Sequence, residues 1–226
     1  MPGLTILDSS MSSGSKAEAL AAEACRIARS SSGICFGYMV VMVALGLWVD
    51  TTETGAQVLL LPNVVSIPLG YFLTTEMIDR SGLGQGSPSG GFAIYLGLSI
   101  VSGIALFVGF VLLLLPGLVL LVRWAPAYAI ALVEGVGATS ALQRAWHMTK
   151  GHGAAIFIVM LVPIALAAGG IGLSLFLETD ETLMAIPESL VLNIGLFGAT
   201  VAGTAIGLAS YSLLCDRYEG VAKVFD

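Results

Sequence analysis

Few residues in this chain have the types and spacing that catalytic or metal sites require. His147 and His152 are the only histidines, and their separation of five residues places them on different faces of a helix. The three cysteines, Cys25, Cys35 and Cys215, follow no metal-binding spacing. The Gly-x-Ser-x-Gly, P-loop and His-Glu-x-x-His patterns do not occur. The sequence therefore predicts no catalytic residue, no metal and no cofactor, and we expect a protein that is not an enzyme.

Arg123 is the one cation inside a long apolar run, where it is flanked by Trp124 and Pro126. An arginine within the hydrocarbon of a membrane is unfavourable by several kcal/mol, and less so when its long side chain reaches the head groups. Two roles stay open for it. The guanidinium could contact a lipid phosphate or a substrate anion, or it could bond carbonyl groups that the nearby prolines leave exposed.

A second group of cations lies on a predicted amphipathic helix, residues 140–151. Ser140 and Gln143 have the spacing of a capping box, and Gly151 suits the position just past the helix end. Leu142, Ala145 and Trp146 share one face of this helix, and the opposite face is polar and cationic, as in helices that lie at a membrane surface. The alternative is that these cations only fix the topology. The candidate lipid or partner contacts are Arg123, Trp124, Arg144, Trp146, His147 and Lys150.

The composition indicates that these residues belong to an integral membrane protein. Of the 226 residues, 57% are hydrophobic and only 11% are charged. Six apolar segments are long enough to cross about 30 Å of hydrocarbon, at approximately residues 34–49, 56–78, 153–177 and 189–215, with two more within 92–134. The fold class we predict is all-α: a polytopic membrane bundle of about six transmembrane helices, with amphipathic helices at the N-terminus and in an inner loop.

The distribution of cations predicts the orientation of this bundle. Apart from Arg123, every lysine and arginine falls in the N-terminal region, the second or fourth loop, or the C-terminal region, and the opposite loops are acidic. Because cationic loops stay in the cytoplasm, both termini should be cytoplasmic. We expect a cytoplasmic tail with a short helix at 1–33, a transmembrane domain at 34–215 and a second cytoplasmic tail at 216–226. The first helix should begin at a capping box of Ser15 and Glu18.

Two further patterns concern packing. Pro116 and Gly117 interrupt a leucine-rich run and predict a hairpin turn between the third and fourth segments. In the last segment, small residues recur every four positions and should let another helix approach closely. A flexible hinge is the functional alternative. The residues of this small-residue strip are Gly195, Ala199, Gly203 and Gly207.

One part of the chain resembles a known family. The order Leu115-Pro-Gly-Leu118, Arg123-Trp124, Glu134-Gly135 and then Ala141–Gly151 is similar to the bacterial membrane domain of the glycerophosphoryl diester phosphodiesterase type and to YciC-like six-helix membrane proteins. The resemblance covers residues 111–160 and implies a protein of the bacterial cytoplasmic (inner) membrane. In fused members a separate soluble domain performs the hydrolysis. This chain has Ala145 where the family often has serine.

Several functions are compatible with these observations. We expect a non-enzymatic membrane protein that contacts membrane lipids or scaffolds a membrane-protein partner in the bacterial envelope. The alternatives are a small transporter or channel, and a membrane subunit of a separately encoded phosphodiesterase. No basic stripe or aromatic-rich basic patch points to nucleic acid as a partner.

Overall fold

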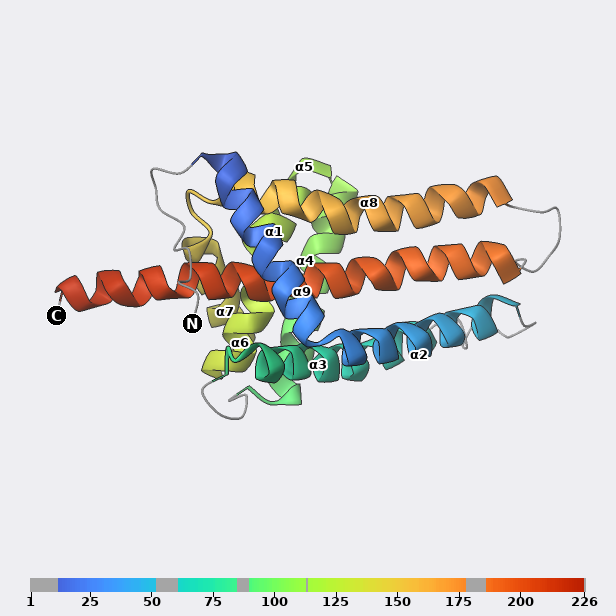
Figure 1. Cartoon of the computed structure of the whole chain (residues 1–226), viewed down its shortest axis with the longest axis horizontal. Helices are drawn as coiled ribbons and strands as arrows, with labels where there is room; N and C mark the ends of the chain where they lie inside the picture. Colours follow the sequence, from blue (N-terminus) through green and yellow to red (C-terminus); the bar gives the residue numbers. More distant parts are fainter. Residues whose placement is uncertain (1–11, 52–60, 85–89, 113, 178–185, 226) are drawn as a thin grey trace.

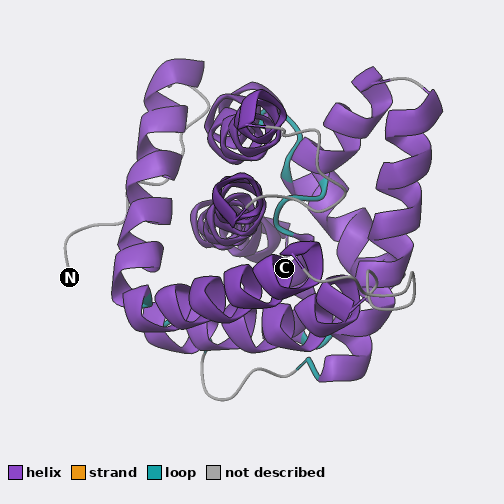
Figure 2. Ribbon diagram, turned by 90° about the vertical axis from the view of Figure 1, so that its right-hand side faces the viewer, coloured by secondary structure: helices purple, strands orange, loops and turns teal. Residues whose placement is uncertain are grey.

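The computed structural model describes residues 12–51, 61–84, 90–112, 114–177 and 186–225, and within these ranges every regular element is an α-helix (Figure 2). The predicted all-α class is therefore confirmed. In chain order the helices are α1 (Ser13–Ser30), α2 (Ser32–Thr51), α3 (Leu61–Ser81), α4 (Phe92–Leu112), α5 (Leu114–Arg123), α6 (Ala127–Glu134), α7 (Ala138–Met148), α8 (Gly153–Leu177) and α9 (Ile186–Phe225).

Within the described residues, five segments are long and apolar enough to cross a membrane: Ser32–Thr51, Phe92–Val111, Leu115–Glu134, Gly153–Leu177 and Ile186–Cys215. They correspond to five of the six predicted segments. The remaining one corresponds to α3. Its mean hydropathy over the described residues is lower, because it contains the polar and charged residues Asn63, Glu76, Asp79 and Arg80. Residues 52–60, where that segment was predicted to begin, lie outside the described residues, so the sixth span stays a prediction.

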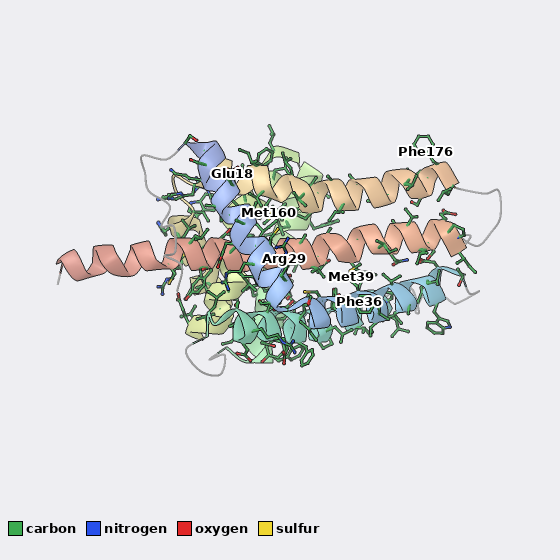
Figure 3. All side chains as sticks on the ribbon, in the orientation of Figure 1. Glu18, Arg29, Phe36, Met39, Met160 and Phe176 are labelled. Atoms are coloured by element: carbon green, nitrogen blue, oxygen red, sulfur yellow. The ribbon has the colours of Figure 1, made fainter. Side chains whose placement is uncertain are left out.

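The long helices form the body of the bundle. Figure 1 shows α8 and α9 running side by side along the long axis, with α2 on the other side of α9. Large apolar side chains on these helices face outward, including Phe36 at 72% and Phe176 at 90% of their full exposure (Figure 3). Such a continuous exposed apolar surface is typical of helices that face lipid.

Helix α1 crosses α9 and α8 near one end of the bundle (Figure 1). Leu20 and Ile27 on its apolar stripe are completely buried, and the hydroxyl of Ser212 on α9 donates to the Glu23 carboxylate at 3.1 Å. The predicted N-terminal helix is thus present and docks on the bundle. Its predicted capping box is wrong: the N-cap is Ser12, whose side chain accepts the backbone N–H of Ser15.

The hairpin between the third and fourth segments turns earlier than predicted. Helix α4 ends at Leu112 and α5 begins at Leu114, so Pro116 and Gly117 lie in the first turn of α5. A proline is tolerated there because the first N–H groups of a helix have no intrahelical acceptor. Gly117 instead permits close packing, since a Cβ at this position would lie 2.7 Å from the ring of Phe110 on α4.

Candidate functional site

The predicted contact residues meet where α5, α6 and α7 join. Pro126 cannot donate a backbone hydrogen bond and disfavours helical geometry at the residue before it, so the fourth apolar segment is divided at 124–126 into α5 and α6. The break is held by the backbone N–H of Ala127, which donates to the Trp124 carbonyl at 2.9 Å. Arg123 therefore lies at the end of a helix, beside a change of chain direction.

Helix α7 returns to this junction after a left-handed turn at Gly135, whose φ is 66°. It begins after Gly137, which caps the helix without a side-chain hydrogen bond, and Ser140 lies within the first turn. The capping box predicted for Ser140 and Gln143 is therefore wrong. Ala141, Leu142, Ala145 and Met148 are buried against the bundle, so the predicted amphipathic helix is present over Ala138–Met148.

Two contacts join the end of α7 to the end of α5. The guanidinium carbon of Arg123 lies 5.3 Å from the ring centre of Trp146, a cation–π arrangement. The hydroxyl of Thr149 donates to the Arg123 carbonyl at 3.3 Å and to the Ala145 carbonyl at 2.9 Å. Nη1 of Arg123 is buried and has no hydrogen-bond partner among the described residues. The junction thus contains a cationic donor with unused hydrogen-bonding capacity.

A groove of about 240 Å³ opens beside this cation–π pair. Its walls are Trp124, Leu142, Gln143, Trp146 and His147, and the side chains of Gln143 and His147 are exposed. The structure therefore brings four of the six candidate residues, Arg123, Trp124, Trp146 and His147, into one neighbourhood. We call this the junction groove.

Arg144 and Lys150 are placed differently. Nη1 of Arg144 lies 2.5 Å from Oε2 of Glu134, the last residue of α6, and the hydroxyl of Tyr211 on α9 donates to Oε1 of the same carboxylate at 3.2 Å. Lys150 is exposed beyond the end of α7. The cationic face predicted for the helix at 140–151 is therefore incomplete, because the Glu134 carboxylate neutralises the charge of Arg144. The ion pair joins residues of two different helices, so the spacing of residues within one helix could not predict it.

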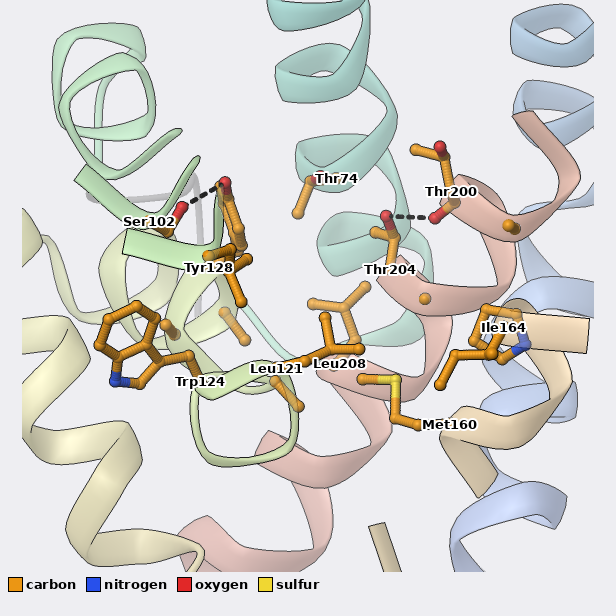
Figure 4. A pocket seen from close by; sticks show the side chains of 18 of the residues that line it. Thr74, Ser102, Leu121, Trp124, Tyr128, Met160, Ile164, Thr200, Thr204 and Leu208 are labelled. Carbon is orange, nitrogen blue, oxygen red and sulfur yellow. Dashed lines mark hydrogen bonds between the residues drawn. The ribbon is translucent and has the colours of Figure 1, made fainter. Parts of the chain in front are cut away.

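Next to the junction groove lies a cavity of about 450 Å³ enclosed mainly by α4, α6, α8 and α9 (Figure 4). Trp124 and Leu142 belong to both walls, so the groove and this apolar cavity adjoin. Most of the cavity lining is aliphatic, including Leu121, Met160 and Leu208. No sequence pattern indicated this space, because its walls come from helices far apart in the chain.

The hydroxyl groups in the apolar cavity are already engaged. Ser102 donates to the Leu98 carbonyl at 2.7 Å and lies 3.2 Å from the Tyr128 hydroxyl, and Thr204 donates to the Thr200 carbonyl at 2.9 Å (Figure 4). Because these groups bond within the protein, the cavity does not require a polar occupant. Its chemistry fits a hydrocarbon chain.

The small-residue strip of α9 has two different environments. A Cβ at Gly195 would lie 2.7 Å from the Gly170 Cα on α8, and a Cβ at Gly207 would lie 2.5 Å from the Ala125 carbonyl oxygen. Ala199 and Gly203 instead line the apolar cavity, and a Cβ at Gly203 would meet nothing within 4 Å. The predicted close approach thus occurs at the two ends of the strip, and the prediction is wrong for Gly203.

No protein-family model, no curated protein and no solved structure matches this chain. The resemblance at residues 111–160 therefore stays an expectation, and the site has to be interpreted from its own geometry.

Proposed function

We propose that this chain is a multi-pass protein of the bacterial cytoplasmic membrane that binds a membrane lipid with an anionic head group, without catalysing a reaction. One observation carries the proposal: the junction groove, which has two indoles in its wall and Arg123 stacked on one of them, shares Trp124 and Leu142 with a cavity suited to a hydrocarbon chain. A lipid has the same sequence of parts, a charged head followed by an apolar tail.

The head group would be held by charge and hydrogen bonding. A phosphate oxygen in the groove would provide an acceptor for the Arg123 guanidinium, whose Nη1 has none among the described residues. Trp124 and Trp146 are amphipathic rings of the kind that favour the depth of the head groups. The exposed His147 in the groove wall could donate a ring N–H hydrogen bond to another phosphate oxygen.

The tail would occupy the apolar cavity. Its volume of about 450 Å³ falls in the range of about 300–1,000 Å³ that ligand pockets commonly have. Burial of methylene groups there contributes about 0.8 kcal/mol each relative to water. That gain largely vanishes relative to the bilayer, since lipid tails are equally apolar. Selectivity among lipids would therefore come from the head group at Arg123.

Lipid binding by the purified full chain tests this proposal. Native mass spectrometry should show retained phosphatidylglycerol, and Arg123→Gln should weaken it by about 10- to 100-fold, since a hydrogen bond to a charged group is worth about 1.5–3 kcal/mol. Arg80→Gln is the matched control because Arg80 is bonded to Glu76 on α3. Equal retention by the Arg123 variant and the unmodified protein would refute the role of Arg123.

A second variant tests the tail. Gly203→Leu places a side chain in open cavity space, and it should reduce binding of a long-chain phosphatidylglycerol while sparing a short-chain analogue. Equal loss of both lipids would show that the tail lies elsewhere.

A small transporter or channel is the second candidate function, and one observation favours it. A more polar cavity between α2, α3, α4 and α9 shares Tyr95 and Thr200 with the apolar cavity, so the two lie in series. If they form a path, proteoliposomes containing Tyr95→Ala should admit glycerol faster than those containing the unmodified protein. Equal rates, both at the level of empty liposomes, would exclude the path.

A further inference from the structure

The more polar cavity, of about 540 Å³, has charged and polar side chains in its wall that the proposed lipid binding does not involve. It lies near the ends of α2 and α9 that are remote from the junction groove, and among the described residues of its wall Asp50 is the only one with a charged side chain. Hydroxyl and amide groups make up the other polar lining, among them those of Asn63, Ser66 and Ser99. We call this the Asp50 cavity.

The Asp50 carboxylate is held in place by two donors from α9. The Ser189 hydroxyl donates to Oδ2 at 2.6 Å, and Nδ2 of Asn193 donates to the same oxygen at 2.8 Å. Asn193 is only 5% exposed, and its Nδ2 also donates to the Ser189 carbonyl at 2.8 Å. These neutral donors fix the orientation of the carboxylate and bring no opposite charge to it.

A glycine on α2 makes room for this arrangement. A Cβ at Gly46 would overlap the side-chain amide of Asn193, so only glycine leaves space for the amide in its observed position. Four residues further along α2, Asp50 meets the same amide. The arrangement therefore depends on the particular residue type at each of the positions 46, 50, 189 and 193.

The negative charge of Asp50 has no cationic partner in the described part of the chain. The ion pairs found there join Arg26 to Glu23, Arg80 to Glu76 and Arg144 to Glu134. A carboxylate at the wall of a cavity between membrane helices is unfavourable unless a cation or water compensates it. The cavity thus favours a positively charged occupant.

The size and the aromatic wall restrict the kind of cation. A space of about 540 Å³ is much larger than one metal ion, and no group of three metal-ligating side chains occurs among the described residues. Tyr38, Tyr95 and Phe197 add ring surface to the wall, which suits the hydrocarbon part of an organic cation. From these features we infer that the Asp50 cavity binds a small organic ammonium ion, with its charged group at Asp50 and its apolar remainder inside the cavity.

Calorimetric titration of the purified full chain with n-propylammonium, at fixed ionic strength, tests the inference. Propylammonium should bind, neutral propanol should not, and Asp50→Asn should weaken binding by at least tenfold. The asparagine oxygen can still accept from Ser189 and Asn193, so the fold should persist. Thr204→Val, in the apolar cavity, is the matched control and should bind like the unmodified protein.

The remaining outcomes are also decisive. Equal responses to propylammonium and propanol, or to propylammonium and potassium, would overturn the assignment to an organic cation. If Asp50→Asn does not fold, Ser66→Phe offers a second route, because it fills the cavity from α3 without touching the Asp50 hydrogen bonds. Unchanged propylammonium affinity in that variant would place the ligand elsewhere. The site is separate from the junction groove, so either proposal can fail without the other.

Discussion

Replacing Gly195 by alanine should separate α8 from α9 at their closest contact. The added methyl group would lie 2.7 Å from both the Gly170 Cα and the Leu166 carbonyl oxygen, which are backbone atoms. Restoring ordinary contact at 3.4 Å requires a displacement of about 0.7 Å between two helices that pack along much of their length. A backbone cannot rotate away as a flexible side chain can.

The size of the effect follows from the cost of overpacking. Inserting a methylene into a close-packed interior destabilises by about 1–3 kcal/mol. For a chain of this size, each kcal/mol of destabilisation lowers the melting temperature by about 2–4 °C, so Gly195→Ala should melt roughly 2–12 °C below Gly203→Ala. Gly203→Ala is the matched control, since it lies eight residues along the same strip and its Cβ meets nothing within 4 Å. Both changes replace glycine by alanine in a helix, so the difference in propensity cancels.

The measurement is thermal unfolding of both variants in the same detergent and at the same scan rate, followed by circular dichroism. A fixed scan rate matters because membrane proteins often aggregate on unfolding. Gly170→Ala combined with Gly195→Ala should destabilise by less than the sum of the two, because both methyl groups enter one contact. Identical melting temperatures for Gly195→Ala and Gly203→Ala would refute the reasoning.

Three other predictions concern separate parts of the molecule. Hydrogen bonding and charge from Arg26 lower the pKa of Glu23. The ionised Glu23 therefore stabilises the docked α1 above the pKa that this group has in the unfolded chain, and the stabilisation is lost as the pH falls through the lower folded pKa. Glu23→Gln should flatten the pH dependence of the melting temperature between about pH 7 and 3. Gly46→Ala should displace the Asn193 amide and lower the melting temperature, and an unchanged value would show that α2 yields without strain. A Ser13→Cys probe should resist impermeant thiol reagents in intact cells, and labelling from outside would overturn the cytoplasmic location of the N-terminus.

Periodicity and composition were sufficient to predict the helical class and the positions of five long apolar segments. They also predicted the amphipathic α7, whose buried face repeats every three to four residues. The helix ends were predicted less well. Both proposed capping boxes fall inside helices that begin three residues earlier, because Ser12 and Gly137 also provide suitable cap geometry. A local motif could not decide between these starting points.

The candidate site could be predicted only where its residues lie close in sequence. Arg123 and Trp124 were recognisable because a cation in an apolar run is unfavourable without a special environment. The pairing of Arg144 with Glu134 depends on the chain reversal at Gly135, and the contact of Asp50 with Asn193 joins helices at opposite ends of the sequence. Cavities between such helices have no signature in a single sequence, since each helix contributes only a few scattered wall residues.

The docking of α1 has a consequence for how the protein is made. Leu20 and Ile27 are completely buried, and α1 packs mainly on α9 and α8, which the ribosome synthesises well after α1. At about 5–20 residues per second, roughly 10–40 s separate the emergence of Ile27 from that of Leu208 on α9. During this interval the apolar stripe of α1 lacks its permanent partners and has to be sheltered at the membrane surface or by a chaperone. A chain that stops before α9 would keep that stripe uncovered.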